Sequence, residues 1–134
     1  MKVLTIKQPY ASLIMAGIKK YEFRTWKTSY RGEVLIHSSK TLDKKAMKEF
    51  NYDLDYPLGF IIGKVDITDV IKVDDDFRKV LEKENSFIYN HVINDKSFDG
   101  YAFKLENLEL LNPIYINGKL GLWNYDINYN DEKL

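Results

Sequence analysis

The stretch LTIKQPYASLIMAGIKKYEFRTW, residues 4–26, decides the fold because it contains a complete strand–helix–strand unit. The apolar, β-branched run at residues 3–6 predicts a short strand. Pro9 suits the first turn of a helix, where its φ is already helical and its missing N–H costs nothing. Apolar residues at helical spacing predict a helix over residues 9–16, and Gly17 supplies its C-terminal stop.

The densest functional signal follows this helix. Period-2 alternation over residues 19–27 predicts a strand with Glu22, Arg24 and Trp26 on one face. Lys19 stands at the mouth of the preceding loop, so three ionic groups lie within reach of one ligand. Such a trio can bind a phosphate or a base edge, or hold a lysine whose pKa is lowered enough to act as a base. The same residues are also compatible with a surface ion pair worth at most about 1 kcal/mol.

The rest of the chain is richer in strands than in helices. Gly59 and Gly63 interrupt a long apolar segment, where glycine usually marks a bulge or a bend that curls a sheet into a barrel. This order of elements predicts an α+β fold, a small mixed barrel with two to three flanking helices. We expect one long bent strand or two at 58–73, strands at 34–37, 101–105 and 108–111, helices at 41–50 and after the acidic run 74–76, and loops at 52–57 and 84–98.

Length and composition limit the function classes. With 134 residues, 45% of them apolar, residues 1–134 are expected to form a single domain. The absence of cysteine excludes a disulfide framework, a thiol nucleophile and an iron–sulfur cluster. The first residues lack the apolar run of a signal peptide, and no segment approaches the roughly 20 apolar residues of a membrane span. We therefore expect a soluble, cytoplasmic protein with no membrane partner.

Charge is zero in total but unevenly distributed. Residues 1–48 hold 11 lysines and arginines against 3 acidic residues, whereas residues 49–134 hold 9 against 17. Because local clustering sets the surface field, the N-terminal third predicts an electropositive patch suited to nucleic acid. If the two segments interleave in space, however, their charges cancel.

Motifs at both ends of the chain resemble the ASCH domain of the PUA-like superfamily. The first set comprises Leu4-x-Ile6-Lys7-Gln8-Pro9-Tyr10, Gly17-x-Lys19-x-x-Glu22-x-Arg24-x-Trp26, Tyr30-Arg31-Gly32 and Ile36-His37-Ser38-Ser39-Lys40. The second set is similar to the closing strands of the same family and comprises Tyr101-Ala102-Phe103, Pro113-Ile114 and Gly118-x-x-Gly121-Leu122-Trp123. Residues 50–100 are then the variable part.

The resemblance implies a PUA-like barrel of five to six strands with a cleft beside the first helix. Members of the family are mostly regarded as RNA-binding or nucleic-acid-linked domains, so the expected partner is RNA or a nucleotide, bound without cofactor or metal by a monomer or weak dimer. Trp26 and then Tyr10 are the best candidates for stacking on an unpaired base. The candidate contacts in the cleft and on its rim are Lys7, Gln8, Tyr10, Lys19, Glu22, Arg24, Trp26, Arg31, Ser39 and Lys40.

Two other function classes remain open. One is a small metal-independent hydrolase of RNA or an acylated nucleoside, with Lys19 as base and Glu22 as acid or orienting group. Ribonuclease activity has been attributed to an ASCH protein, and a bacterial branch resembling the family hydrolyses acetylated cytidine with a lysine and a threonine three residues later. Glu22 stands in that threonine position, and a glutamate cannot act as a hydroxyl nucleophile. The other class is a protein-interaction domain whose basic cleft is incidental.

Three weaker motifs have structural explanations. His37 precedes a serine on a strand, where successive side chains point to opposite faces, so we expect a hydrogen-bonded, structural histidine. The acidic run 74–76 lacks the ligand spacing and glycine of a calcium loop and is expected to cap a helix. His91 has no partner in the sequence, so a metal site has no support.

Overall fold

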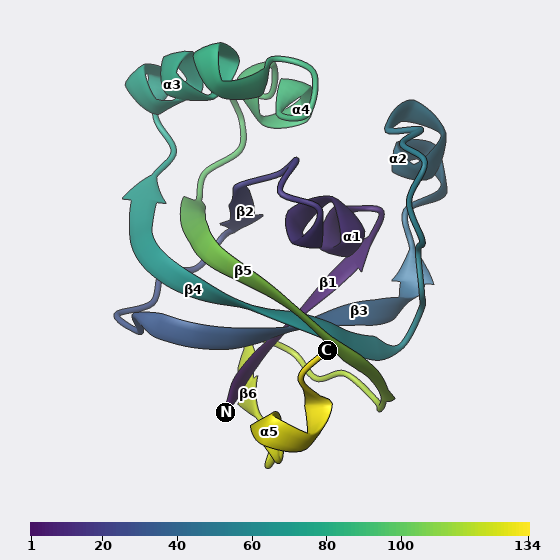
Figure 1. The fold of residues 1–134 in the computed structure, drawn as a ribbon. Coiled ribbons are helices and arrows are strands. Elements are labelled where there is room, and N and C mark those ends of the chain that lie inside the picture. Colours follow the sequence, from purple (N-terminus) through teal and green to yellow (C-terminus); the bar gives the residue numbers. More distant parts are fainter.

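The structure is a computed structural model that describes the backbone of residues 1–134 and the side chains of residues 1–128 and 130–134. Strands and helices combine into the predicted α+β fold (Figure 1). The elements are β1 (Lys2–Gln8), α1 (Tyr10–Met15), β2 (Tyr21–Arg24), β3 (Gly32–Leu42), α2 (Lys44–Glu49), β4 (Phe60–Lys72), α3 (Asp75–Asn85), α4 (Asn90–Ile93), β5 (Tyr101–Tyr115), β6 (Leu122–Asn124) and α5 (Tyr129–Glu132).

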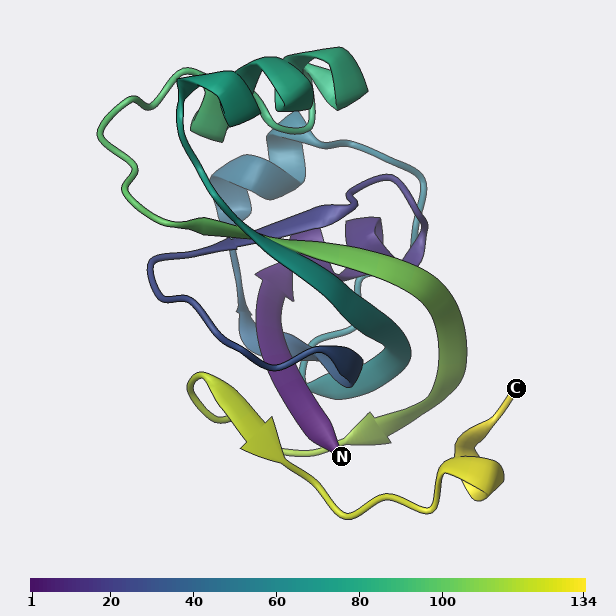
Figure 2. The same ribbon diagram turned by 90° about the vertical axis from the view of Figure 1, so that its left-hand side faces the viewer.

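The six strands form one curved sheet in the order β2-β5-β4-β3-β1-β6. Strands β1 and β3 are parallel, and the other neighbouring pairs are antiparallel. The long strands β4 and β5 bend together around the centre of the domain (Figure 2). The sheet is curved but not closed, because β2 and β6 are short edge strands that pair only with β5 and β1 in the described residues. This open, barrel-like sheet is compatible with the predicted fold.

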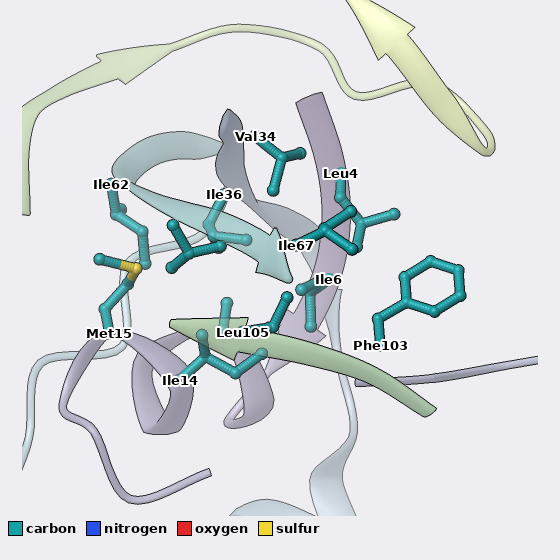
Figure 3. Close-up of a cluster of buried hydrophobic side chains, with 12 residues drawn as sticks. Leu4, Ile6, Ile14, Met15, Val34, Ile36, Ile62, Ile67, Phe103 and Leu105 are labelled. Carbon is teal, nitrogen blue, oxygen red and sulfur yellow. The ribbon is translucent and has the colours of Figure 1, made fainter. Parts of the chain in front are cut away.

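Helix α1 packs on the sheet and is buried from Ala11 to Met15, beyond the single apolar face that its sequence spacing predicts. Its Ile14 and Met15 meet strand residues including Ile6, Ile36 and Ile62 in the main core (Figure 3). Burial of such a side chain contributes roughly 1.5–3 kcal/mol. The contact is close at Gly63, where a Cβ would lie 2.8 Å from the carbonyl oxygen of Glu109 and overlap Met15. The register of β4 also shifts between Ile61 and Gly63, in agreement with the predicted bulge.

A second core cluster joins α1 to the helices above the sheet. Leu13 of α1 shares this cluster with Phe50, Phe77, Leu81 and Tyr89. Helix α3 begins where predicted, because the carboxylate of Asp74 accepts a hydrogen bond from the amide of Phe77. These contacts hold α3 and α4 over β2, beside α1 (Figure 1). None of the helices among the described residues is long and apolar enough to cross a membrane.

Several predicted elements have different bounds. The strand predicted at 19–27 is limited to β2 and ends at Arg24. The two strands predicted at 101–105 and 108–111 are one strand, β5, that passes through Asn107 at a φ of 58°. The loop predicted at 84–98 instead contains the end of α3 and the short helix α4, and Ile88 and Tyr89 within it are buried.

Candidate nucleic-acid interface

A buried ionic triad occupies the end of the α1–β2 unit. Lys19 Nζ donates hydrogen bonds to the carbonyl oxygen of Tyr21 and, at 2.8 Å, to Oε1 of Glu22. Nη2 of Arg24 donates to Oε2 of Glu22 at 3.0 Å and to the carbonyl oxygen of Thr5 at 2.9 Å. One carboxylate therefore joins the two cations, and the triad is tied to β1.

Local backbone geometry explains why these residues meet. Gly17 adopts a φ of 77° after α1, and the amides of Ile18 and Lys19 both donate to the carbonyl oxygen of Leu13. The chain thus reverses direction in a compact helix end of the kind that glycine permits. Glu22 then lies in strand β2, where Arg24, two residues later, is on the same face of the strand.

Burial of Lys19 and Glu22 strengthens the electrostatic interactions within the triad. Lys19 is 4% exposed and Glu22 8% exposed. Burial lowers the pKa of Lys19 below its ordinary value of 10.5, although Glu22 favours the charged ammonium. Burial alone raises the pKa of Glu22, but Lys19 and Arg24 outweigh this effect and hold the pKa below 4.5. Glu22 is therefore ionised at neutral pH and orients both cations.

The triad lies at the edge of a first hollow of about 190 Å³. Lys19 Nζ lies 5.1 Å from the ring centroid of Phe23 and 5.5 Å from that of Tyr10. Burial raises the pKa of Tyr10 to about 12, so its phenol keeps its proton at neutral pH. The hollow is mainly aromatic and apolar, and its lining residues are Tyr10, Lys19, Glu22, Phe23, Ile88, Tyr89, His91 and Val92.

A second hollow of about 390 Å³ adjoins the first and has a different character. The two share Tyr10, Glu22 and Phe23, so the triad's carboxylate lies at their boundary. The second hollow is bordered by polar and basic side chains from distant segments, namely Lys7, Arg24, Ser39 and Lys119. An aromatic hollow and a hollow bordered by cations therefore adjoin at these three shared residues.

Comparison with known proteins agrees with this architecture. The ASCH domain family matches residues 4–119. This chain belongs to the ASCH domain family. The ASCH domain is 32% identical over 81 residues to human Activating signal cointegrator 1, a match that covers 51% of this chain and 14% of the human protein. The mouse protein of the same name is 29% identical over 103 residues, covering 64% of this chain and 18% of the relative.

Solved ASCH structures share the fold. The ASCH protein of Zymomonas mobilis superposes with a TM-score of 0.65 at 14% identity, over 97% of this chain and 90% of that one. A point mutant of the same protein gives a TM-score of 0.61 at 17% identity, over 86% and 75% of the two chains. At these identities the likeness shows the fold alone.

The predicted contacts separate into two groups in this ASCH domain. Lys19, Glu22 and Arg24 come together, and Tyr10, Lys7 and Ser39 line the adjoining hollows. Lys40 lies farther along, among the residues of a third hollow. The N-terminal cations therefore converge in part on one side of the molecule, as the charge distribution predicts.

Three of the predicted contacts lie elsewhere. The prediction for Gln8 is wrong, because its side chain is fully buried and binds Ser12 and the carbonyl oxygen of Pro57. Trp26 lies beyond the end of β2, half-buried, with its ring edge-on to Phe103 at 5.2 Å, and its contact with a base stays a prediction. Arg31 donates to the carbonyl oxygens of Thr28 and Tyr30, and among the described residues it borders none of these hollows.

Sequence reasoning missed the far wall of the first hollow. Ile88, Tyr89, His91 and Val92 come from the segment predicted as loop. His91 Nε2 lies 3.1 Å from the carboxylate of Glu49 on α2, so it does have a partner. The apolar spacing of Ile88, Tyr89 and Val92 is a helical signal that could have identified this wall.

His37 has the structural role that the sequence predicts. It is fully buried, with Nδ1 3.2 Å from the hydroxyl of Thr5 and Nε2 2.9 Å from the carbonyl oxygen of Ile116. In the described part of the chain, no group of three or more His, Asp or Glu side chains is arranged to hold a metal ion.

Proposed function

We propose that this ASCH domain binds single-stranded RNA, with one unpaired base in the first hollow and its phosphate over the second. The observation that carries the proposal is that an aromatic hollow and a cationic one share lining residues at the Lys19–Glu22–Arg24 triad. An exposed base presents a flat ring beside a charged phosphate, and ring-stacking sites next to basic side chains are the usual means of holding it.

Size and chemistry of the first hollow fit a single ring. Its volume of about 190 Å³ lies below the roughly 300 Å³ at which sites for drug-sized molecules begin. Phe23 and Tyr89 meet edge to face with centroids 5.8 Å apart and offer apolar surface to a base. Tyr10 keeps a hydroxyl donor, and stacking of a base is worth about 1–3 kcal/mol.

Charge at the second hollow fits a phosphate. Among the described residues, no carboxylate oxygen lies within 4 Å of the Lys7 or Lys119 ammonium. Arg24 uses Nη2 for both of its described bonds, which leaves donors on Nε and Nη1. Glu22 is neutralised by its two partners, so the net charge of this end is positive.

The test is fluorescence anisotropy of a short labelled single-stranded RNA at several salt concentrations. The Lys7→Glu variant is expected to bind about tenfold or more weakly and to show a reduced salt slope. Lys79→Glu, on the exposed surface of α3, is the matched charge control. Equal affinity of wild type and Lys7→Glu, or affinity independent of salt, contradicts the proposal. Single-stranded DNA of the same sequence and an RNA duplex measure the preference for unpaired RNA.

A hydrolase acting on RNA or an acylated nucleoside is the second candidate. The buried position of Lys19 and its lowered pKa favour this alternative, because such a lysine is a better base than an exposed one. Labelled RNA and acetylated cytidine are incubated with the wild type and with Lys19→Ala. Turnover that disappears in the variant supports catalysis, whereas no turnover at high protein concentration supports a binding module.

A further inference from the structure

The second hollow adjoins a third of about 450 Å³. The two have Thr5, Ser39, Lys119 and Leu120 in common, so they are adjacent parts of one trough. The third hollow adds residues from the end of β3 and from the segment between β5 and β6, namely His37, Lys40, Asn117 and Gly118.

The floor of the third hollow is a hydrogen-bonded network of Thr5, His37 and Trp123. The carbonyl oxygen of Ile116 can only accept, so Nε2 of His37 donates to it at 2.9 Å. The Trp123 indole donates to the Thr5 hydroxyl at 3.1 Å, and that hydroxyl lies 3.2 Å from Nδ1 of His37. Gly118 packs directly on this network, since a Cβ there would lie 2.8 Å from the Thr5 hydroxyl and 2.9 Å from the imidazole.

Two lysines supply positive charge around this floor. Lys40 Nζ lies 4.8 Å from the ring centroid of Tyr115 and donates to the side-chain oxygen of Asn117. Lys119 Nζ lies 5.9 Å from the ring centroid of Trp123. Within the described residues, neither ammonium has a carboxylate oxygen within 4 Å. The rings position the lysines without neutralising them, so donors and charge remain for an anion.

We propose that the third hollow is a second phosphate subsite, with Lys40 as its principal ligand. This inference rests on the proposed function and deepens it: the ASCH domain binds at least two consecutive phosphates of an extended RNA strand, not a lone nucleoside. Lys119 lies between the two subsites and contributes to both, because it borders both hollows. Basic side chains that line successive adjoining hollows suit the phosphates of a polynucleotide backbone.

The test compares a mononucleotide with di- and trinucleotides of the same base, each with wild type, Lys40→Gln and the control Lys44→Gln on α2. Wild type and control are expected to bind the longer strands about tenfold more tightly than the mononucleotide. Lys40→Gln is expected to lose this gain while keeping its affinity for the mononucleotide. Its salt slope for the trinucleotide should fall by about 0.7.

The outcomes separate this inference from the proposed function. Wild-type protein that binds the mononucleotide as tightly as the trinucleotide overturns the second subsite and leaves the first intact. If Lys40→Gln still binds the trinucleotide more tightly than the mononucleotide by the full wild-type factor, the second subsite is also overturned. Thermal unfolding verifies that this variant is folded. Wild-type protein that binds neither ligand overturns both proposals.

Discussion

Glu22 accepts hydrogen bonds from two cations at once, from Lys19 Nζ at 2.8 Å and from Arg24 Nη2 at 3.0 Å. The three side chains are not equivalent, because only the carboxylate touches both partners. Removing Lys19 leaves Glu22 paired with Arg24, whereas removing the charge of Glu22 leaves a buried ammonium facing a guanidinium. The triad's stability therefore depends on its central member.

Glu22→Gln is expected to lower the free energy of unfolding by about 3–5 kcal/mol, because it leaves buried positive charge without a counter-charge. Lys19→Met should cost less, about 1–3 kcal/mol, since the remaining ion pair survives. Urea denaturation measures both values. Glu82→Gln, at an exposed position of α3, serves as the control and should change stability by less than about 0.5 kcal/mol. Equal losses in the two triad variants would falsify the bridging role.

At acid pH the wild type should lose its higher free energy of unfolding relative to Glu22→Gln. The folded-state pKa of Glu22 lies below 4.5, because Lys19 and Arg24 outweigh the effect of burial. The unfolded chain therefore takes up the proton first, and the stability that Glu22 contributes is complete above pH 4.5 and lost as pH falls through the folded pKa. Denaturation of both proteins over a pH series gives the difference directly. A constant difference down to the acid limit of folding argues against an ionised Glu22.

The triad could be predicted from the sequence because its geometry is local. Glu22 and Arg24 share a face by strand alternation, and Gly17 ends the helix that precedes them. The same rule does not place Trp26 on the face of Glu22 and Arg24, because β2 and its alternation end at Arg24. Gln8 failed for a related reason: it follows Lys7 in β1, and strand neighbours point to opposite faces, so both could not lie on one rim.

The remaining differences come from long-range packing. Asn85, Asn90 and Asn94 are typical of loops, yet the segment containing them is ordered by the burial of Ile88 and Tyr89 against α1 and β2. Strand β5 likewise continues past Asn107 because β4 provides a partner along its length. Such pairing overrides local preference, and no spacing rule within one segment reveals it.

Gln8→Ala should destabilise the ASCH domain without changing the proposed RNA site. The Gln8 amide donates to Ser12 Oγ at 2.8 Å and to the Pro57 carbonyl at 2.9 Å, and its oxygen accepts from the Ser12 amide. Its loss leaves buried groups without partners at a cost of about 1–3 kcal/mol. Thermal unfolding measures that loss. RNA affinity, measured well below the unfolding temperature, should equal that of the wild type; weaker binding by the folded variant would restore Gln8 to the interface.

Tyr89 allows ring stacking to be separated from folding, because its hydroxyl and its ring have different tasks. The hydroxyl accepts a hydrogen bond from the Lys20 amide at 2.7 Å, and the ring forms part of the first hollow beside Phe23. Tyr89→Phe leaves that amide unpaired and is expected to cost about 1–3 kcal/mol of stability while keeping RNA affinity. Tyr89→Leu should lose a similar hydrogen bond and also weaken RNA binding by about five- to tenfold, because a branched aliphatic chain offers a base no flat surface. Denaturation measures the stability of both variants, and anisotropy measures their RNA affinity. Equal RNA affinity in the two variants would contradict the binding of a base in the first hollow.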